Sequence, residues 1–126
     1  MERDEAQLLG ISMRSAVIPL ALEPPLVGPA EPLFVGFPEL RNKRWALYLS
    51  RLDPKKNVEG LLRAIAACRT ELPDLRWILA GDGDPAYVVA LHATARQLGV
   101  DDRIIWPGHL QGAQKQAAFN HAEVFV

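Results

Sequence analysis

Short, continuously apolar segments alternate with longer amphipathic segments along most of this chain. The clearest apolar segments are WALYLS (45–50), RWILAG (76–81), RIIW (103–106) and EVFV (123–126). Runs of this length without polar interruption are typical of strands that are buried on both faces. Because amphipathic helical segments separate them, we expect an α/β fold with an open, parallel, doubly wound (Rossmann-like) sheet.

Three segments carry apolar residues at helical spacing. Residues 58–72 and 111–122 are two of them, and the third, 85–99, has Asp84 as its predicted N-cap, Pro85 in its first turn and Gly99 at its end. Toward the amino terminus, residues 4–10 resemble the end of a helix and residues 15–22 a short strand. Residues 22–43 contain five prolines and predict a stiff loop without helix.

The composition excludes several classes of function. The 126 residues carry a net charge of −1, so nothing favours binding to nucleic acid. The single cysteine, Cys68, rules out an internal disulfide, and the three histidines have no metal-ligand spacing. No apolar run approaches the roughly 20 residues that span a bilayer, and the charged opening MERDEAQLLG does not resemble a signal peptide. We expect a cytoplasmic protein that binds no metal.

The stretch SRLDPKKN places Arg51 and Lys56 between a predicted strand and a predicted helix. Ligands of open α/β sheets bind beyond the carboxyl ends of the strands, where helix amino termini attract anions. Two interpretations stay open: the two cations clamp a diphosphate, or they face water in a turn in which Asp53 caps the following helix.

The stretch GDGDPA fits G-x-G-x-x-A, a variant of the dinucleotide fingerprint. Gly81 and Gly83 would let a ligand approach the backbone, as in half of an NAD-dependent dehydrogenase. A tight turn with Asp84 as the helix cap explains the same residues. His109 follows the next strand and is the best-placed histidine for a functional contact.

Two long stretches together resemble a known enzyme family. LYLSRLDPKKNVEGLLRAIAACRTELPDLRWILAGDGD and LGVDDRIIWPGHLQGAQKQAAFNHAEVFV are similar to the carboxyl-terminal domain of glycosyltransferase family 4. These are retaining enzymes of the GT-B fold that use nucleotide sugars, often in polysaccharide or glycolipid synthesis. The resemblance implies a hexosyltransferase-type enzyme whose partner is a nucleotide-sugar donor and which needs no cofactor.

The resemblance also implies roles for individual residues. Arg51 and Lys56 match the pair that holds the donor diphosphate, and Gly81 and Gly83 match glycines that line the donor cleft. The loop that touches the nucleobase corresponds to three further positions: Gly108, His109 and Leu110.

By this resemblance, residues 1–12 are the tail of a helix from an amino-terminal domain, and residues 13–126 are a partial donor-binding domain. The family's paired glutamates, E-x7-E, would lie beyond AEVFV, so no catalytic residue is assigned. We expect the polypeptide alone to be inactive and its partners to include the missing domain. We also expect self-association through the edge at EVFV. The alternatives are a non-catalytic Rossmann-like nucleotide-binding or regulatory module and half of an NAD-dependent dehydrogenase.

Overall fold

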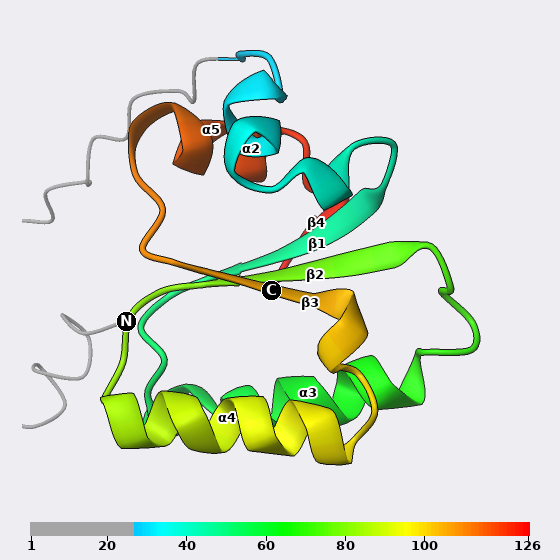
Figure 1. Ribbon diagram of the computed structural model, residues 1–126, viewed down its shortest axis with the longest axis vertical. Coiled ribbons are helices and arrows are strands. Elements are labelled where there is room, and N and C mark those ends of the chain that lie inside the picture. Colours follow the sequence, from blue (N-terminus) through cyan, green and yellow to red (C-terminus); the bar gives the residue numbers. More distant parts are fainter. Residues whose placement is uncertain (1–26) are drawn as a thin grey trace, which may run out of the picture.

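The computed structural model describes residues 27–126 and shows a parallel sheet between two layers of helices (Figure 1). The strands are β1 (Arg44–Leu49), β2 (Leu75–Ala80), β3 (Ile104–Gly108) and β4 (Val124–Phe125), in the spatial order β3-β2-β1-β4. The α-helices are α2 (Glu31–Gly36), α3 (Val58–Ala67), α4 (Pro85–Gln97) and α5 (Gly112–Asn120). Single-turn 3-10 helices are η1 (Pro38–Leu40), η2 (Pro54–Lys56) and η3 (Asp101–Arg103).

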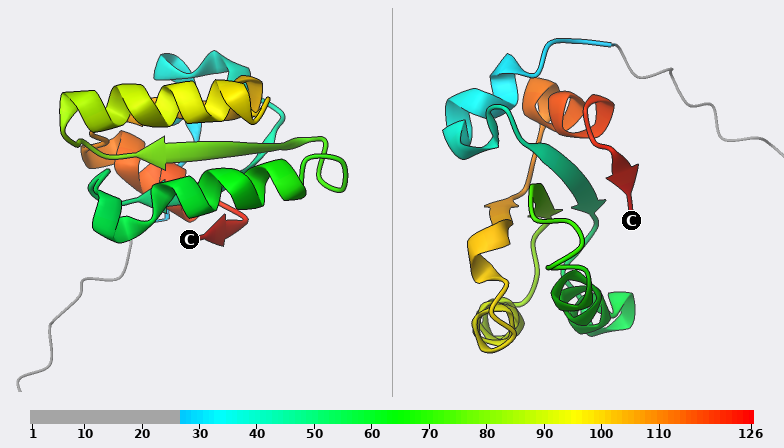
Figure 2. Two further views of the ribbon diagram at one scale, coloured as in Figure 1. Left: turned by 90° about the horizontal axis from the view of Figure 1, so that it is seen from below. Right: turned by 90° about the vertical axis from the view of Figure 1, so that its right-hand side faces the viewer.

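The predicted α/β class and parallel, doubly wound sheet are confirmed. The chain builds outward from β1 to β2 and β3, and then crosses back to place β4 on the other side of β1. Helices α3 and α4 cover one face, while α2 and α5 cover the other (Figure 2). The strand order therefore reverses between β1 and β4, which is where a sheet of this type opens a crevice for ligands.

Alternating side chains of the central strands divide the core into two layers. Tyr48 and Leu79 face α3 and α4, whereas Leu47 and Ile78 face α2 and α5. This period of two explains why the strands are apolar throughout, since each of their faces packs against helices. The predicted strands at 45–50, 76–81, 103–106 and 123–126 are all present within a residue or two of those bounds.

The prediction that residues 22–43 form a loop without helix is wrong for the described part of that segment. Helix α2 and η1 lie within it, and each has a proline in its first turn. A proline lacks only an N–H that the first turn would leave unpaired, so it begins a helix instead of breaking one. Leu33 and Leu40 are fully buried from these turns. The predictions for residues 4–10, 15–22, the rest of the loop and residues 1–12 lie outside the described residues.

Helix α4 begins where its cap residue predicts, whereas α3 ends earlier than its apolar spacing predicts. The Asp84 carboxylate accepts hydrogen bonds from the backbone N–H of Ala86 and Tyr87, so it caps α4 as predicted. Helix α3 ends at Ala67, which is shorter than the predicted 58–72, and Leu72 lies in the following turn with 40% of its surface exposed.

The loops after β1 and β2 pack together through their backbones. The Leu52 N–H donates to the Asp82 carbonyl at 2.9 Å, and Leu52 forms a parallel bridge with Gly83. A Cβ added to Gly81 would lie 1.9 Å from the Ser50 carbonyl oxygen, and one on Gly83 would lie 2.2 Å from that of Leu52. Only glycine allows this approach, so both glycines are required to join the two loops.

Strand β4 completes one edge of the sheet. Its start is held by Arg44, whose guanidinium donates to both carboxylate oxygens of Glu123 at 2.7 Å and holds the pKa of Glu123 below its usual value. The Phe119 and Phe125 rings lie 5.2 Å apart, and both remain about half exposed. No described helix is both long and apolar enough to cross a membrane.

Substituting Gly81 tests the loop contact. Gly81 has φ +151°, and its Cβ would collide with backbone, so Gly81→Ala should lower the free energy of unfolding by at least about 2 kcal/mol. Gly112→Ala is the matched control, because Gly112 has φ +49° but open space around it and should cost only about 1 kcal/mol. Urea unfolding measures both, and equal losses would contradict the loop contact.

Tyr87 gives the fold a measurable dependence on alkaline pH. Its hydroxyl donates to Glu59 at 2.8 Å, and burial together with this carboxylate raises the pKa of Tyr87 to about 12 from 10.0. The folded state therefore holds the proton more tightly than the unfolded state, so this stabilisation is complete below pH 10.0 and is lost as the pH rises to about 12. Tyr87→Phe should therefore lose less stability than the parent chain between pH 10 and about pH 12. Urea unfolding midpoints of both proteins, measured across that interval, test this. Parallel loss in both proteins would show that Tyr87 contributes nothing.

Exposed apolar side chains at β4 are the basis for predicting that a polypeptide of these residues associates with itself. An edge strand with Val124, Phe125 and Val126 each about half exposed offers unpaired backbone and apolar surface to a second copy. Phe125→Lys should shift sedimentation profiles at high concentration toward monomer. Val35→Lys, which removes an isolated exposed valine of α2, should leave them unchanged. A monomeric parent chain would contradict the prediction.

Candidate functional site

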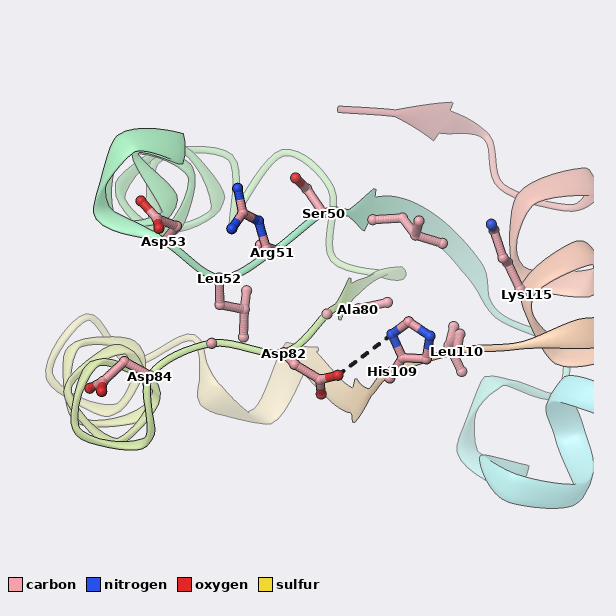
Figure 3. A pocket seen from close by; sticks show the side chains of 13 residues that line it. Ser50, Arg51, Leu52, Asp53, Ala80, Asp82, Asp84, His109, Leu110 and Lys115 are labelled. Carbon is pink, nitrogen blue, oxygen red and sulfur yellow. Dashed lines mark ion pairs between the residues drawn. The ribbon is translucent and has the colours of Figure 1, made fainter. Parts of the chain in front are cut away.

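A pocket of about 640 Å³ lies at the carboxyl ends of β1, β2 and β3 (Figure 3). It is formed by the β1–α3 loop, the β2–α4 loop, the β3–α5 loop and one residue of α5. Its lining residues are Leu49, Ser50, Arg51, Leu52, Asp53, Ala80, Gly81, Asp82, Gly83, Asp84, His109, Leu110 and Lys115. The pocket thus lies at the carboxyl edge of the sheet, where open α/β sheets bind ligands, but on the β1–β3 side and without a lining residue from β4.

The β1–α3 loop is fixed by contacts on both sides of Arg51. The Tyr48 hydroxyl donates to the Arg51 carbonyl at 3.0 Å, and burial of this ring raises the pKa of Tyr48 above its ordinary value. Leu52 is buried against the neighbouring loop with 4% of its surface exposed. With its backbone held in this way, Arg51 projects an exposed guanidinium at the pocket.

The carboxylates of the pocket already have partners inside the chain. Asp84 caps α4, and Asp53 accepts from the backbone N–H of Lys55 at 2.9 Å. Asp82 lies 3.5 Å from Nδ1 of His109, an ion pair when the imidazole is protonated (Figure 3). By contrast, neither Arg51 nor Lys115 makes an ion pair or a side-chain hydrogen bond with any residue in 27–126. The charged side chains left without a partner in these residues are therefore the two cations, whose N–H groups can donate to an anion.

The structure brings together most of the residues that the sequence singled out. Arg51, Gly81, Gly83, His109 and Leu110 all line the pocket. Gly108 does not line it. It forms a turn with φ +68°, and its carbonyl accepts from the Gly81 N–H at 2.8 Å.

Lys56 is the exception among the predicted cations. It ends η2, is exposed and is absent from the pocket lining. Asp53 caps η2 and not α3, whose N-cap is Asn57 with φ 51°. The prediction that Asp53 caps the helix at 58–72 is therefore wrong, because the single turn of η2 separates Asp53 from α3. A contact between Lys56 and a ligand stays a prediction.

Lys115 was missed by the sequence reasoning. Residues 111–122 were predicted as a helix that follows a strand end, but nothing in that pattern separates Lys115 from an ordinary solvated lysine. Its place in the pocket comes from the way α5 packs on the sheet, with Ala117 and Ala118 buried.

The glycines of GDGDPA have a structural role that accounts for the motif. Their missing side chains let the β2–α4 loop contact the β1–α3 loop, as described above. A dinucleotide fingerprint is therefore not needed to explain Gly81 and Gly83. Across residues 27–126, no three His, Cys, Asp or Glu side chains converge in an arrangement that could hold a metal ion, and binding without a metal stays a prediction.

Comparisons with known proteins agree with this architecture. Alpha-monoglucosyldiacylglycerol synthase of Streptococcus pneumoniae is 26% identical over 123 residues, which cover 92% of this chain and 27% of that protein. HepE of Anabaena, solved in complex with UDP and glucose, superposes with a TM-score of 0.63 at 25% identity, covering 76% of this chain and 25% of its own.

Sucrose-phosphate synthase of Thermosynechococcus elongatus shares the fold, with a TM-score of 0.73 at 20% identity over 98% of this chain and 32% of its own. The chain therefore spans about a quarter to a third of the length of these proteins. A family model described as Glycosyl transferases group 1 matches residues 34–126. The chain belongs to the Glycosyl transferases group 1 family and has the GT-B type of parallel sheet.

Proposed function

We propose that this domain binds the nucleotide-sugar donor of a retaining glycosyltransferase of family 4. The observation that carries the proposal is the pocket at the strand ends, where Arg51 and Lys115 have no carboxylate partner among the described residues while the aspartates are engaged. A diphosphate would pair with the Arg51 guanidinium, which lines the pocket without a carboxylate partner in residues 27–126. The similarity to HepE, which was solved with UDP and glucose, supports a nucleotide sugar.

The role of Arg51 in the reaction follows from charge. When the glycosidic bond to the donor phosphate breaks, negative charge grows on the leaving nucleoside diphosphate. A guanidinium held beside that group by the Tyr48 contact stabilises the transition state more than the ground state. Lys56 stays a predicted second cation, which would join the diphosphate from the outer side of the loop.

The rest of the whole enzyme's activity is part of the same proposal. The similarity to Alpha-monoglucosyldiacylglycerol synthase supports a glycan or glycolipid acceptor. A cytoplasmic enzyme that contacts the membrane peripherally belongs to the same proposal. This chain supplies one wall of the reaction site. Because positioning donor and acceptor together contributes about 7–11 kcal/mol to lowering a barrier, we expect no transfer by this polypeptide alone.

Titration calorimetry with UDP, GDP and ADP tests the binding proposal. Arg51→Ala should weaken binding of the preferred diphosphate at least about tenfold, because a charged hydrogen bond contributes about 1.5–3 kcal/mol. Lys56→Ala should also weaken it at least about tenfold, and an unchanged affinity would remove Lys56 from the predicted diphosphate site. Lys43→Ala is the control, since it removes the same charge just before β1, at the end of the strand away from the pocket.

Two outcomes would count against the proposal. If the parent chain and Arg51→Ala bind the nucleoside diphosphates with equal affinity, Arg51 does not hold the diphosphate. Tight binding of NADH with no binding of nucleoside diphosphates would favour the dehydrogenase alternative. A protein that binds nucleotide, but whose full-length form transfers no sugar, would instead be the non-catalytic module.

A further inference from the structure

Lys115 enters the pocket from a different layer of the molecule than Arg51 does. Arg51 belongs to the β1–α3 loop, whereas Lys115 lies on α5, and the two occupy opposite sides of the pocket in Figure 3. Among residues 27–126, the Lys115 ammonium has no ion pair and no side-chain hydrogen bond.

Helix α5 holds the backbone of Lys115 in a fixed position. Trp45 of β1 donates its indole N–H to the Ala118 carbonyl of α5 at 3.0 Å inside the core. Ala117 and Ala118 are buried within three residues of Lys115. The Lys115 side chain therefore extends from a helix that is packed on the sheet. A binding side chain is positioned more precisely on such a helix than on a loop.

Apolar residues line part of the pocket. Leu110 lies on the Lys115 side in Figure 3, Leu49 and Ala80 also line the pocket, and Ala80 and Leu110 are almost fully buried. If the diphosphate lies at Arg51, as the proposed function requires, the nucleoside half extends toward this apolar side. A flat base would cover the apolar residues and bring its polar edge to Lys115.

We propose that Lys115 selects the nucleobase of the donor, donating a hydrogen bond to an exocyclic carbonyl oxygen. This inference rests on the proposed function. An ammonium group has three donors and no acceptor, so it pairs with O4 of uracil or O6 of guanine. It finds no acceptor at the same position in cytosine or adenine, where an amino group presents hydrogens of its own. The expected donors therefore carry uracil or guanine.

UDP with CDP is the matched pair for this contact, because the two share the diphosphate and ribose and their rings differ only at C4 and N3. GDP with ADP is a second comparison, in which guanine also carries a 2-amino group that adenine lacks. The parent chain should bind UDP or GDP about tenfold more tightly than its amino counterpart. Lys115→Met, which keeps the length of the side chain without its charge, should abolish that preference and leave CDP and ADP binding unchanged.

Two further variants serve as controls. Lys43→Met removes the same charge outside the pocket and should keep the preference, and Lys115→Arg, which retains a donor, should restore part of it. Because Lys115 is exposed, Lys115→Met should match the parent chain in its urea midpoint. Any change in base preference then reports on the pocket and not on folding.

Each remaining outcome is decisive. Equal weakening of all four diphosphates by Lys115→Met, with uridine binding unaffected, would show that Lys115 contacts phosphate and would overturn the inference. A base preference that is unchanged in Lys115→Met would also overturn the inference. The proposed function would still stand in that case if Arg51→Ala binds the preferred diphosphate about tenfold more weakly. Failure of the parent chain to bind any diphosphate would overturn both.

Discussion

The backbone contact between the β1–α3 and β2–α4 loops is the constraint on which the site depends. Gly81 and Gly83 bring one loop so close to Ser50 and Leu52 that a methyl group on either glycine would collide with a carbonyl oxygen. This contact holds the Arg51 side of the pocket against the Asp82 side. The pocket therefore has a definite shape even though most of its polar side chains are exposed.

Within that frame, hydrogen bonding leaves the formal charges unchanged but decides which charged side chains are free to contact a ligand. The pocket holds three aspartates, which by number would make it acidic. Each of them is already engaged, by a helix end, a turn or a histidine, whereas the two cations have no such partner in residues 27–126. A site that binds an anion can thus be built in a domain whose net charge is −1.

Much of the fold could be predicted because its signals are local. Buried strands are apolar throughout, and Asp84 caps α4 from the residue just before it, so both can be read from a few neighbouring positions. The prolines of residues 27–43 misled the prediction because a proline acts differently in the first turn of a helix than in its middle. Whether a proline begins a helix here depends on tertiary packing, because α2 forms where Leu33 is buried in the core.

By itself, the sequence determined the class of fold, the order of strands and helices along the chain, and the loops that line the pocket, including Arg51. Those properties follow from hydrophobic periodicity and from residues adjacent in the chain. The tertiary structure alone decided that Gly81 and Gly83 join two loops and that Lys115 and not Lys56 lines the pocket. It also decided that Arg51 and Lys115 have no carboxylate partner within residues 27–126. These depend on how α5 packs on the sheet and on contacts between segments 30 or more residues apart, which no local pattern records.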